Sequence, residues 1–524
     1  MGIKVLTNWR NSVYFKNMAI AGRKNMRALF VYPHIPMTFW SFKYALKFIS
    51  KKAASPPLGL LTIAAMVPKA WEKKFIDMNT TRLKDKHLRW ADYVFISGME
   101  LQRHSAREVI ERCKNYGVKI IAGGPLFTIE QADFDDVDHL FLGEVEDTFP
   151  KFLEDMERGE PRHIYCSDEF PDITKTPIPF WKIVKKRKYS LMSIQYSRGC
   201  PFNCEFCNVT MLNGHRPRTK TKEQIIRELD ALYQWGWRDA LFFVDDNFIG
   251  NRRKVKNELL PAIIQWMGER RYPFTFSTQV SVDLADDEEL MHLMIKAGFQ
   301  SVFVGIETPH EESLSECAKH QNIGRDLISS VRKIQQHGFE VQGGFILGFD
   351  NDPESIFVRL TEFIQNTGIV TAMVGLLNAA KGTHLYNRLE TEHRLVKKTS
   401  GDNTDCSLNF IPKMDYKTLV HGYKKVLSTI YSPHHYYERI RTFLEGFRPP
   451  KVRPIYFRFV HIKAFVKSIW YLGIIGREKL HYWRLFFWSL TKRPYLFPSA
   501  IVFAVYGYHF RRMFVEYEKK IPAV

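Results

Sequence analysis

Three closely spaced cysteines constrain this chain more than any other feature. Cys200, Cys204 and Cys207 follow the spacing C-x3-C-x2-C, and no fourth cysteine lies nearby. Thiolates are soft ligands that hold iron–sulfur clusters. In a cluster with four irons, three thiolates leave one iron open to a small molecule. A zinc site is the alternative, but structural zinc takes four ligands, and the fourth would have to come from elsewhere, such as His215.

The residues around the triad have a pattern of their own. The motif begins with Gly-Cys-Pro-Phe, and the aromatic Phe206 stands before the last cysteine. This pattern resembles the radical S-adenosylmethionine (SAM) enzymes. The resemblance implies a 4Fe-4S cluster whose open iron chelates SAM, and reductive cleavage of SAM to a radical that removes hydrogen from a substrate. It also implies an electron donor such as ferredoxin or flavodoxin.

The bulk composition limits the class of protein. A chain of 524 residues is long enough for about three domains. The other cysteines are scattered, at Cys113, Cys166, Cys317 and Cys406, which is not a disulfide framework and favours a reducing compartment. The first residues lack the apolar core of a signal peptide. We therefore expect a cytoplasmic protein.

Residues 26–160 alternate strand-like and helix-like segments, after an N-terminal extension of residues 1–25. The expected strands cover 27–32, 74–78, 93–97 and 119–122, and the expected helices cover 57–67 and 105–116. This alternation predicts a Rossmann-like doubly wound sheet. Ligands of such sheets bind at the carboxyl ends of the strands, which places Ser97, Gly98, Gly123 and Gly124 at the expected binding edge.

The order of this domain before the cysteine triad resembles the cobalamin-binding domain of cobalamin-dependent radical SAM enzymes. Some cobalamin domains carry Asp-x-His-x-x-Gly, whose histidine ligates cobalt. The segment after Phe75–Asn79 has no such histidine, as in many radical SAM relatives. The resemblance implies that the domain binds cobalamin, and the alternative is a vestigial domain that binds nothing.

Residues 161–189 are rich in proline and basic residues, which is typical of a linker. Residues 190–400 follow with six strand–helix units. Their apolar runs lie at 191–196, 240–244, 274–278, 301–306, 342–347 and 370–375, and helical stretches such as 222–234, 286–297 and 325–337 lie between them. A partial (β/α)6 barrel is the natural closure, with chemistry at the carboxyl ends of the strands. Radical SAM enzymes have this fold with the cluster loop after the first strand, and the triad here follows the first strand directly.

Polar residues at these strand ends are candidates for binding SAM. Asp245, Asp246 and Asn247 follow the second strand, where the resemblance implies contact with the SAM ammonium group. An Asx turn with a helix cap is the alternative explanation for them. Ser277 lies near the end of the third strand, and Glu307 ends the fourth in a Gly-x-Glu pattern that lies beside SAM in this family.

Three further residues are weaker candidates. Gly343 lies in the fifth strand, where a missing side chain would let adenine or substrate approach. Cys317 could be a reactive thiol near the site, although a buried inert cysteine is commoner. His215 could donate a proton, but the sequence does not place it.

Residues 401–524 are expected to form a helical, basic and aromatic-rich C-terminal domain. The stretch 451–524 holds 14 Lys/Arg, 3 Asp/Glu and 19 aromatic residues. Its longest uncharged run, 494–510, is interrupted and too short to span a bilayer. Basic residues mixed with Trp, Tyr and Phe suit the lipid headgroup boundary and predict peripheral attachment to the cytoplasmic face of a membrane. A helical cap with core aromatics is the alternative, and both are favoured over a single-stranded nucleic acid site.

Several segments together resemble one subfamily, whose best-known type is the hopanoid C-2 methylase. They are 198–220, 242–250, 341–350 and 409–414. The resemblance implies cobalamin-dependent methylation of an unactivated carbon in a membrane lipid or another hydrophobic small molecule. Radical coupling, cyclisation or rearrangement without methyl transfer is the second hypothesis. A tRNA methylthiotransferase would need another cysteine-ligated cluster, and a non-catalytic cobalamin or iron–sulfur sensor is the last alternative.

Overall fold

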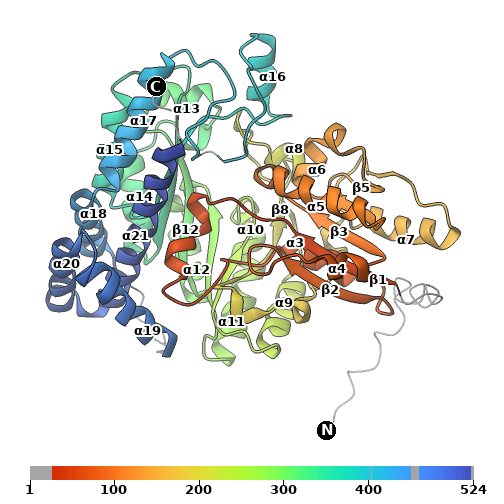
Figure 1. Ribbon diagram of the computed structural model, residues 1–524. Helices are drawn as coiled ribbons and strands as arrows, with labels where there is room; N and C mark the ends of the chain where they lie inside the picture. Colours follow the sequence, from red (N-terminus) through yellow and green to blue (C-terminus); the bar gives the residue numbers. More distant parts are fainter. Residues whose placement is uncertain (1–25, 403, 450–458, 521–524) are drawn as a thin grey trace, which may run out of the picture. The chain divides into compact units, whose positions relative to one another are not determined.

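The computed structural model describes residues 26–402, 404–449 and 459–520 (Figure 1). The chain divides into two compact units. The first unit takes in the chain up to His34 together with Pro57–Val184, and the second takes in Ile35–Pro56 together with the chain from Lys185 onward. The domain limits drawn from the sequence, including a linker over 161–189, stay predictions.

The first unit is built on a sheet of six parallel strands in the order β2-β1-β3-β4-β5-β6. The strands are β1 (Arg27–Tyr32), β2 (Glu72–Asp77), β3 (Tyr93–Ser97), β4 (Lys119–Gly123), β5 (His139–Phe141) and β6 (Ile164–Tyr165). The order reverses between β1 and β3, which is the switch point where doubly wound sheets bind their ligands. The Rossmann-like fold predicted for this part of the chain is confirmed.

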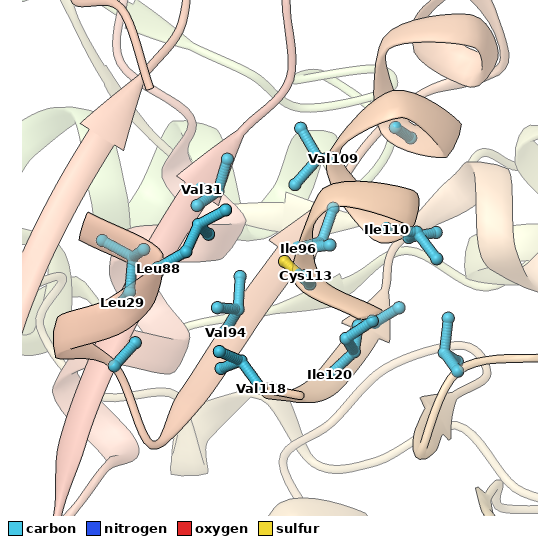
Figure 2. Packing of buried hydrophobic residues seen from close by; sticks show 14 of the residues in the cluster. Leu29, Val31, Leu88, Val94, Ile96, Val109, Ile110, Cys113, Val118 and Ile120 are labelled. Atoms are coloured by element: carbon cyan, nitrogen blue, oxygen red, sulfur yellow. The ribbon is translucent and has the colours of Figure 1, made fainter. Parts of the chain in front are cut away.

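Helices cover both faces of this sheet. They are α3 (Leu58–Met66), α4 (Asp85–Trp90), α5 (Arg103–Asn115), α6 (Pro125–Ile129) and α7 (Thr148–Arg158). Alternate residues of β1 supply opposite faces: Leu29 and Val31 join the core with α4 and α5, while Phe30 joins the other core with α3 and α7. Figure 2 shows the first of these cores, where Val109 and Cys113 of α5 lie over the strands.

The second unit contains a sheet of six parallel strands in the order β14-β13-β12-β11-β10-β7. The strands are β7 (Met192–Ile194), β10 (Ala240–Phe243), β11 (Thr275–Val280), β12 (Phe299–Glu307), β13 (Glu340–Leu347) and β14 (Ala372–Leu376). Each strand pairs with the next along the chain, because a helix returns the chain between them. These helices are α9 (Lys222–Gln234), α11 (Leu260–Glu269), α12 (Glu288–Ala297), α14 (Leu327–Gln336) and α15 (Ile356–Thr367). The predicted partial (β/α)6 barrel is confirmed.

Successive residues of strand β12 lie on opposite faces of the barrel sheet. Val302 and Val304 are fully buried on the side that the helices cover. Phe303 and Gly305 alternate with them and therefore lie on the inner side of the sheet. The inner side is where a barrel of this kind holds its site.

The C-terminal region is helical, as predicted. Its helices are α17 (Tyr416–Ile430), α18 (Pro433–Gly446), α19 (Phe459–Ser468), α20 (Lys479–Lys492) and α21 (Phe497–Lys520), and a π-helical segment, η11 (Ile469–Ile474), follows α19 (Figure 1). Another helix, α16 (His384–Thr391), comes before residue 401, where this region was predicted to begin. Among the described residues, no helix is both long enough and apolar enough to cross a membrane.

Residues 35–56 are close in sequence to the first unit but pack on α21. The ring of Phe39 stacks on Phe510 with centroids 4.4 Å apart. The Nε2 of the buried His509 hydrogen-bonds the carbonyl of Phe39 at 3.1 Å, and the hydroxyl of Tyr517 donates to the carbonyl of Met37 at 2.8 Å. The C-terminal helix is therefore tied to a segment near the start of the chain.

Candidate active site

The cysteine loop is closed at its base by a short antiparallel pair, β8 (Ser197–Arg198) and β9 (Arg218–Thr219). Gly199 stands at the entrance with φ of +95°, a conformation that favours glycine. A Cβ on this residue would lie 2.7 Å from the carbonyl oxygen of Gly214. The N–H of Cys200 donates to that same carbonyl at 3.2 Å. The Arg-Gly-Cys sequence therefore reflects a crossing of two backbones that only glycine allows.

The three cysteines of the triad are free thiols on this loop. The N–H of Cys207 donates to the carbonyl of Cys204 at 3.0 Å, which turns the chain between these two. Burial raises the pKa of all three thiols, that of Cys207 to about 12. The ammonium of Lys319 opposes the rise in pKa at all three thiols, and Cys204 adds to it at Cys200 and Cys207, so these groups lie near one another. Three thiols beside a cation, of which Cys204 is buried and the other two are half-buried, fit an iron–sulfur cluster, whose thiolate ligands bring negative charge.

Lys319 is the cation at this site. Its Nζ lies 2.7 Å from Oε1 of Glu307, and both side chains are largely buried. Burial alone would lower the pKa of Lys319, but Glu307 and Cys204 outweigh this effect and keep the pKa above its ordinary value. The pair sits at the end of β12, where the pairing register with β13 shifts and Glu307 takes a φ of +65°. Gly305 makes room for the pair, because its Cβ would meet the Glu307 carboxylate and lie 2.9 Å from the Lys319 Nζ.

The polar residues after β10 hold the cysteine loop. Asp245 is fully buried and accepts hydrogen bonds from the N–H of Tyr196 at 3.1 Å and from both the N–H and the hydroxyl of Ser197. Asp246 accepts from the N–H of Gly199 at 2.9 Å. Burial raises the pKa of Asp245 to about 7, although Ser197 and Tyr196 oppose the shift. The two carboxylates therefore hold the backbone in place where the cysteine loop begins.

The remaining residue of this group faces the next strand. Asn247 donates from Nδ2 to the hydroxyl of Ser281 at 3.1 Å. Contact of Asp245, Asp246 or Asn247 with SAM stays a prediction, and the hydrogen bonds of Asp245 indicate a role in positioning the loop.

Two other SAM candidates lie on opposite sides of the barrel sheet. Ser277 is half-buried between the buried Phe276 and Thr278, so it faces the inner side. Gly343 faces the helices, since its Cβ would lie 2.7 Å from the ring of Phe345, which packs on α15. Close packing is therefore a sufficient reason for glycine at position 343. The roles of both residues toward SAM stay predictions.

The two weaker catalytic candidates differ in their surroundings. Cys317 is buried, and its carbonyl accepts a hydrogen bond from the N–H of Glu205 in the cysteine loop at 2.9 Å. Burial raises the pKa of its thiol, which keeps the thiol protonated. His215 is exposed. Cys317 thus contacts the cysteine loop through its backbone carbonyl, and a catalytic role for Cys317 or His215 stays a prediction.

Helix α16 contacts the cysteine loop through residues that the sequence analysis did not single out. Arg388 binds both carboxylate oxygens of Glu205, at 2.6 and 3.0 Å. The N–H of Leu385 donates to the carbonyl of Glu205 at 2.9 Å, and Nδ2 of Asn203 lies 3.3 Å from Nε2 of His384. Only the spatial arrangement shows these contacts, because no motif links the two segments.

In the first unit, the residues predicted to bind cobalamin come together. Ser97 pairs with Gly123 at the carboxyl ends of β3 and β4. Gly124 has a φ of +96°, and its Cβ would lie 2.8 Å from the hydroxyl oxygen of Ser97. The carbonyl of Gly98 accepts from the N–H of Leu126 at 3.1 Å. Small residues at this edge leave the backbone accessible to a large ligand, which fits the corrin cofactor.

A doubly wound unit followed by a six-stranded partial barrel, with a three-cysteine loop after the first barrel strand, defines a radical SAM enzyme. Three family models match the chain. They are described as "B12 binding domain" over residues 49–153, "Radical SAM superfamily" over residues 194–364, and "Domain of unknown function (DUF4070)" over residues 383–523. The cofactors are accordingly a 4Fe-4S cluster, SAM and cobalamin.

Two relatives match most of the chain. An uncharacterised methyltransferase of Synechocystis sp. is 41% identical over 491 residues, which cover 93% of this chain and 91% of the relative. The hopanoid C-2 methylase of Rhodopseudomonas palustris is 33% identical over 479 residues, which cover 89% of this chain and 90% of the relative. The chain belongs to the family of cobalamin-dependent radical SAM methyltransferases.

Solved structures share the fold. The radical SAM methyltransferase TsrM from Kitasatospora setae, solved with cobalamin and a [4Fe-4S] cluster, matches with a TM-score of 0.61 at 14% identity, covering 94% of this chain and 100% of that one. The cobalamin-dependent SAM radical enzyme OxsB matches with a TM-score of 0.60 at 13% identity, covering 97% and 82%. These likenesses extend the agreement in fold over nearly the whole chain.

Proposed function

We propose that this enzyme methylates an unactivated carbon of a membrane lipid of the hopanoid type. The observation that carries the proposal is the match to a hopanoid C-2 methylase over 89% of the chain, which includes the C-terminal region as well as the two cofactor domains. The proposal includes an electron donor such as ferredoxin or flavodoxin, and work at the cytoplasmic face of the membrane where the substrate lies.

The cofactors supply the difficult chemistry: when bound, the cluster and SAM generate a radical that can take hydrogen from the substrate, and cobalamin supplies the methyl group. The chain's own residues position these groups. We assign Cys200, Cys204 and Cys207 as cluster ligands. Asp245 fixes the start of their loop, and the Lys319 ammonium offsets the negative charge of the thiolates.

The inner side of the barrel also has a surface that fits an apolar substrate. Trp40 is 36% exposed and packs edge-on against Phe303 with ring centroids 5.5 Å apart. Its indole N–H points to the sulfur of Met373 at 3.0 Å. Gly344 allows the ring of Phe303 to lie close to the sheet, because a Cβ there would be 2.6 Å from Phe303 Cζ. These side chains would contact a hydrocarbon ring system without offering a charged partner.

The test is a comparison of lipid extracts from cells with and without the gene, together with anaerobic purification and quantification of iron, sulfide and cobalt. A product heavier than its precursor by one methylene group supports methylation. Carbon–carbon coupling would instead lose hydrogen, and an identical lipid profile with unmodified tRNA would favour a sensor. A cobalt-free protein that still forms product would exclude cobalamin-dependent methyl transfer.

A further inference from the structure

The hairpin of α19, η11 and α20 exposes a row of large apolar side chains. Along α19 and η11 the row consists of Phe459, Ile462, Val466, Trp470 and Ile474, with exposed fractions between 48% and 70%. Spacings of three and four residues place these side chains on one helix face. Apolar residues so arranged on a surface mark an interaction site.

The opposite face of the same helix packs against the protein. Ser468 and Leu472 are fully buried, and the hydroxyls of Ser468 and Tyr482 are 3.0 Å apart. The row therefore points away from the protein body while the helix is fixed by its other side. The exposure of the row is therefore a property of the folded, packed helix.

A second row on α20 continues this surface. It consists of Leu480, Phe487 and Leu490, with exposed fractions between 46% and 69%. Trp483 joins the two rows: its indole N–H donates to the carbonyl of Gly473 at 2.9 Å, and its ring stacks on Phe487 with centroids 5.7 Å apart. Gly473 permits this approach, because a Cβ there would lie 3.1 Å from Trp483 Cζ2.

The charge on this hairpin has one sign. Residues 459–496 contain seven basic residues, namely Lys463, Lys467, Arg477, Lys479, Arg484, Lys492 and Arg493. The one acidic residue in the range, Glu478, is buried and pairs with Arg511 at 2.7 Å. The exposed charges that the hairpin itself carries are thus all positive. A bilayer with anionic headgroups complements this pattern of an apolar stripe bordered by cations.

We propose that this hairpin docks the enzyme on an anionic lipid bilayer. The two apolar rows enter the boundary between headgroups and acyl chains, and the lysines and arginines contact lipid phosphates. Trp470, which is 55% exposed, suits the interfacial depth, because an indole has an apolar body and a polar N–H. The inference rests on the proposed function in that a lipid substrate requires access to a membrane, but its evidence is the surface of the hairpin alone.

The test is flotation of the full-length holoenzyme with vesicles of phosphatidylcholine and phosphatidylglycerol in equal parts, compared with phosphatidylcholine alone. We expect binding to the anionic vesicles that weakens at high salt. The double variant Ile462→Glu, Val466→Glu should reduce the bound fraction about tenfold, since it places two carboxylates in the apolar row. The matched control is Val358→Glu, at a 56% exposed valine on α15, which should bind like the wild type. All of these positions are exposed, so thermal unfolding should be unchanged.

Several outcomes would overturn the inference. The wild type could remain unbound to both kinds of vesicle, or the double variant could bind as well as the wild type. If the wild type instead forms a dimer that the double variant abolishes, without binding vesicles, the surface is an interface between two copies.

Methylation of a detergent-solubilised substrate separates this inference from the proposed function. If the enzyme methylates the solubilised lipid but does not bind vesicles, the proposed function is correct and the docking surface is wrong. If it binds vesicles but methylates no lipid, the docking surface is correct and the proposed function is wrong.

Discussion

Arg388 and Glu205 form a two-point ion pair between helix α16 and the cysteine loop. Nε of Arg388 lies 2.6 Å from Oε1 of Glu205, and Nη2 lies 3.0 Å from Oε2. Nη1 of Arg388 also binds Asp350 at 3.0 Å. Burial alone would raise the pKa of Asp350, but Arg394 and Arg388 outweigh it and hold the pKa at about 2. The first helix of the region of unassigned role thus anchors the loop that carries the cluster ligands.

Removal of this anchor should loosen the cluster. In Arg388→Gln, Glu205 loses both charge-assisted hydrogen bonds. Loss of hydrogen bonds that orient metal ligands from outside lowers metal affinity or activity by roughly 10-fold to 100-fold. We expect less iron per chain after anaerobic reconstitution, and a broadened electron paramagnetic resonance spectrum of the reduced cluster. Arg388→Lys should recover part of the iron, because it keeps the charge but not the two-point geometry.

A comparable ion pair elsewhere supplies the control. Arg107 of α5, in the first unit, binds both carboxylate oxygens of Asp136 at 2.7 and 2.9 Å. Arg107→Gln should leave iron content and spectrum unchanged. If both arginine variants lose iron equally, general destabilisation explains the effect and the anchor role is wrong.

Local patterns made much of the fold predictable. Helix α9 was predicted over 222–234 and has those bounds, because Thr221 and Gln224 form a capping box in which each side chain bonds the other's backbone N–H, at 3.2 and 2.9 Å. Strand β3 likewise covers the predicted apolar run 93–97. Strands β5 and β6 have three and two residues, too few for any period to show in the sequence.

Long-range contacts were the part that could not be predicted. His509 and Phe39 are 470 residues apart, and Arg388 and Glu205 are 183 residues apart. No local propensity or spacing connects such positions. Only the structure shows that residues 35–56 pack on α21 and that Arg388 binds the cysteine loop. The candidate cluster ligands were found because they share one short motif, whereas the groups that hold the motif in place come from distant segments.

The pair of Lys319 and Glu307 should influence the reduction potential of the cluster. A nearby ammonium favours the reduced, more negative state. Gly305→Ala puts a Cβ against the Glu307 carboxylate and 2.9 Å from Lys319 Nζ, so the pair must move. We expect a more negative potential in Gly305→Ala, measured by redox titration of the cluster spectrum, and the same direction in Lys319→Met. Gly268→Ala is the control, because a Cβ there meets nothing within 4 Å; an unchanged potential in both site variants would contradict the assignment.

Gly124 should be necessary for cobalamin binding. An alanine there combines a φ of +96° with a contact of 2.8 Å to the Ser97 hydroxyl oxygen, so the edge formed by β3 and β4 must shift. Gly124→Ala should therefore lose most of its bound cobalamin, which absorbance of the purified protein reports. Gly117→Ala carries a similar backbone strain at φ of +61° but meets nothing within 4 Å. Equal cobalamin in both variants would mean that this edge is not the binding site.

Acidification should weaken the attachment of α21 through His509. Burial lowers the pKa of His509 from 6.5 to about 4, and its Nδ1 has no hydrogen-bond partner among the residues that the structure describes. The unfolded chain takes up this proton at a higher pH than the folded chain, so the stabilisation is complete above about pH 6.5 and is lost as the pH falls toward 4. The loss should reach roughly 2 kcal/mol at pH 5.

The measurement is the unfolding temperature of the enzyme as a function of pH. His509→Gln keeps a donor for the carbonyl of Phe39 but cannot be protonated, so its unfolding temperature should fall less between pH 7 and pH 5 than that of the wild type. His104→Gln, at a side chain that is 89% exposed, should follow the wild-type curve. Parallel curves for all three proteins would mean that His509 has the same pKa in the folded and the unfolded chain, which would contradict its burial as the source of the pH dependence.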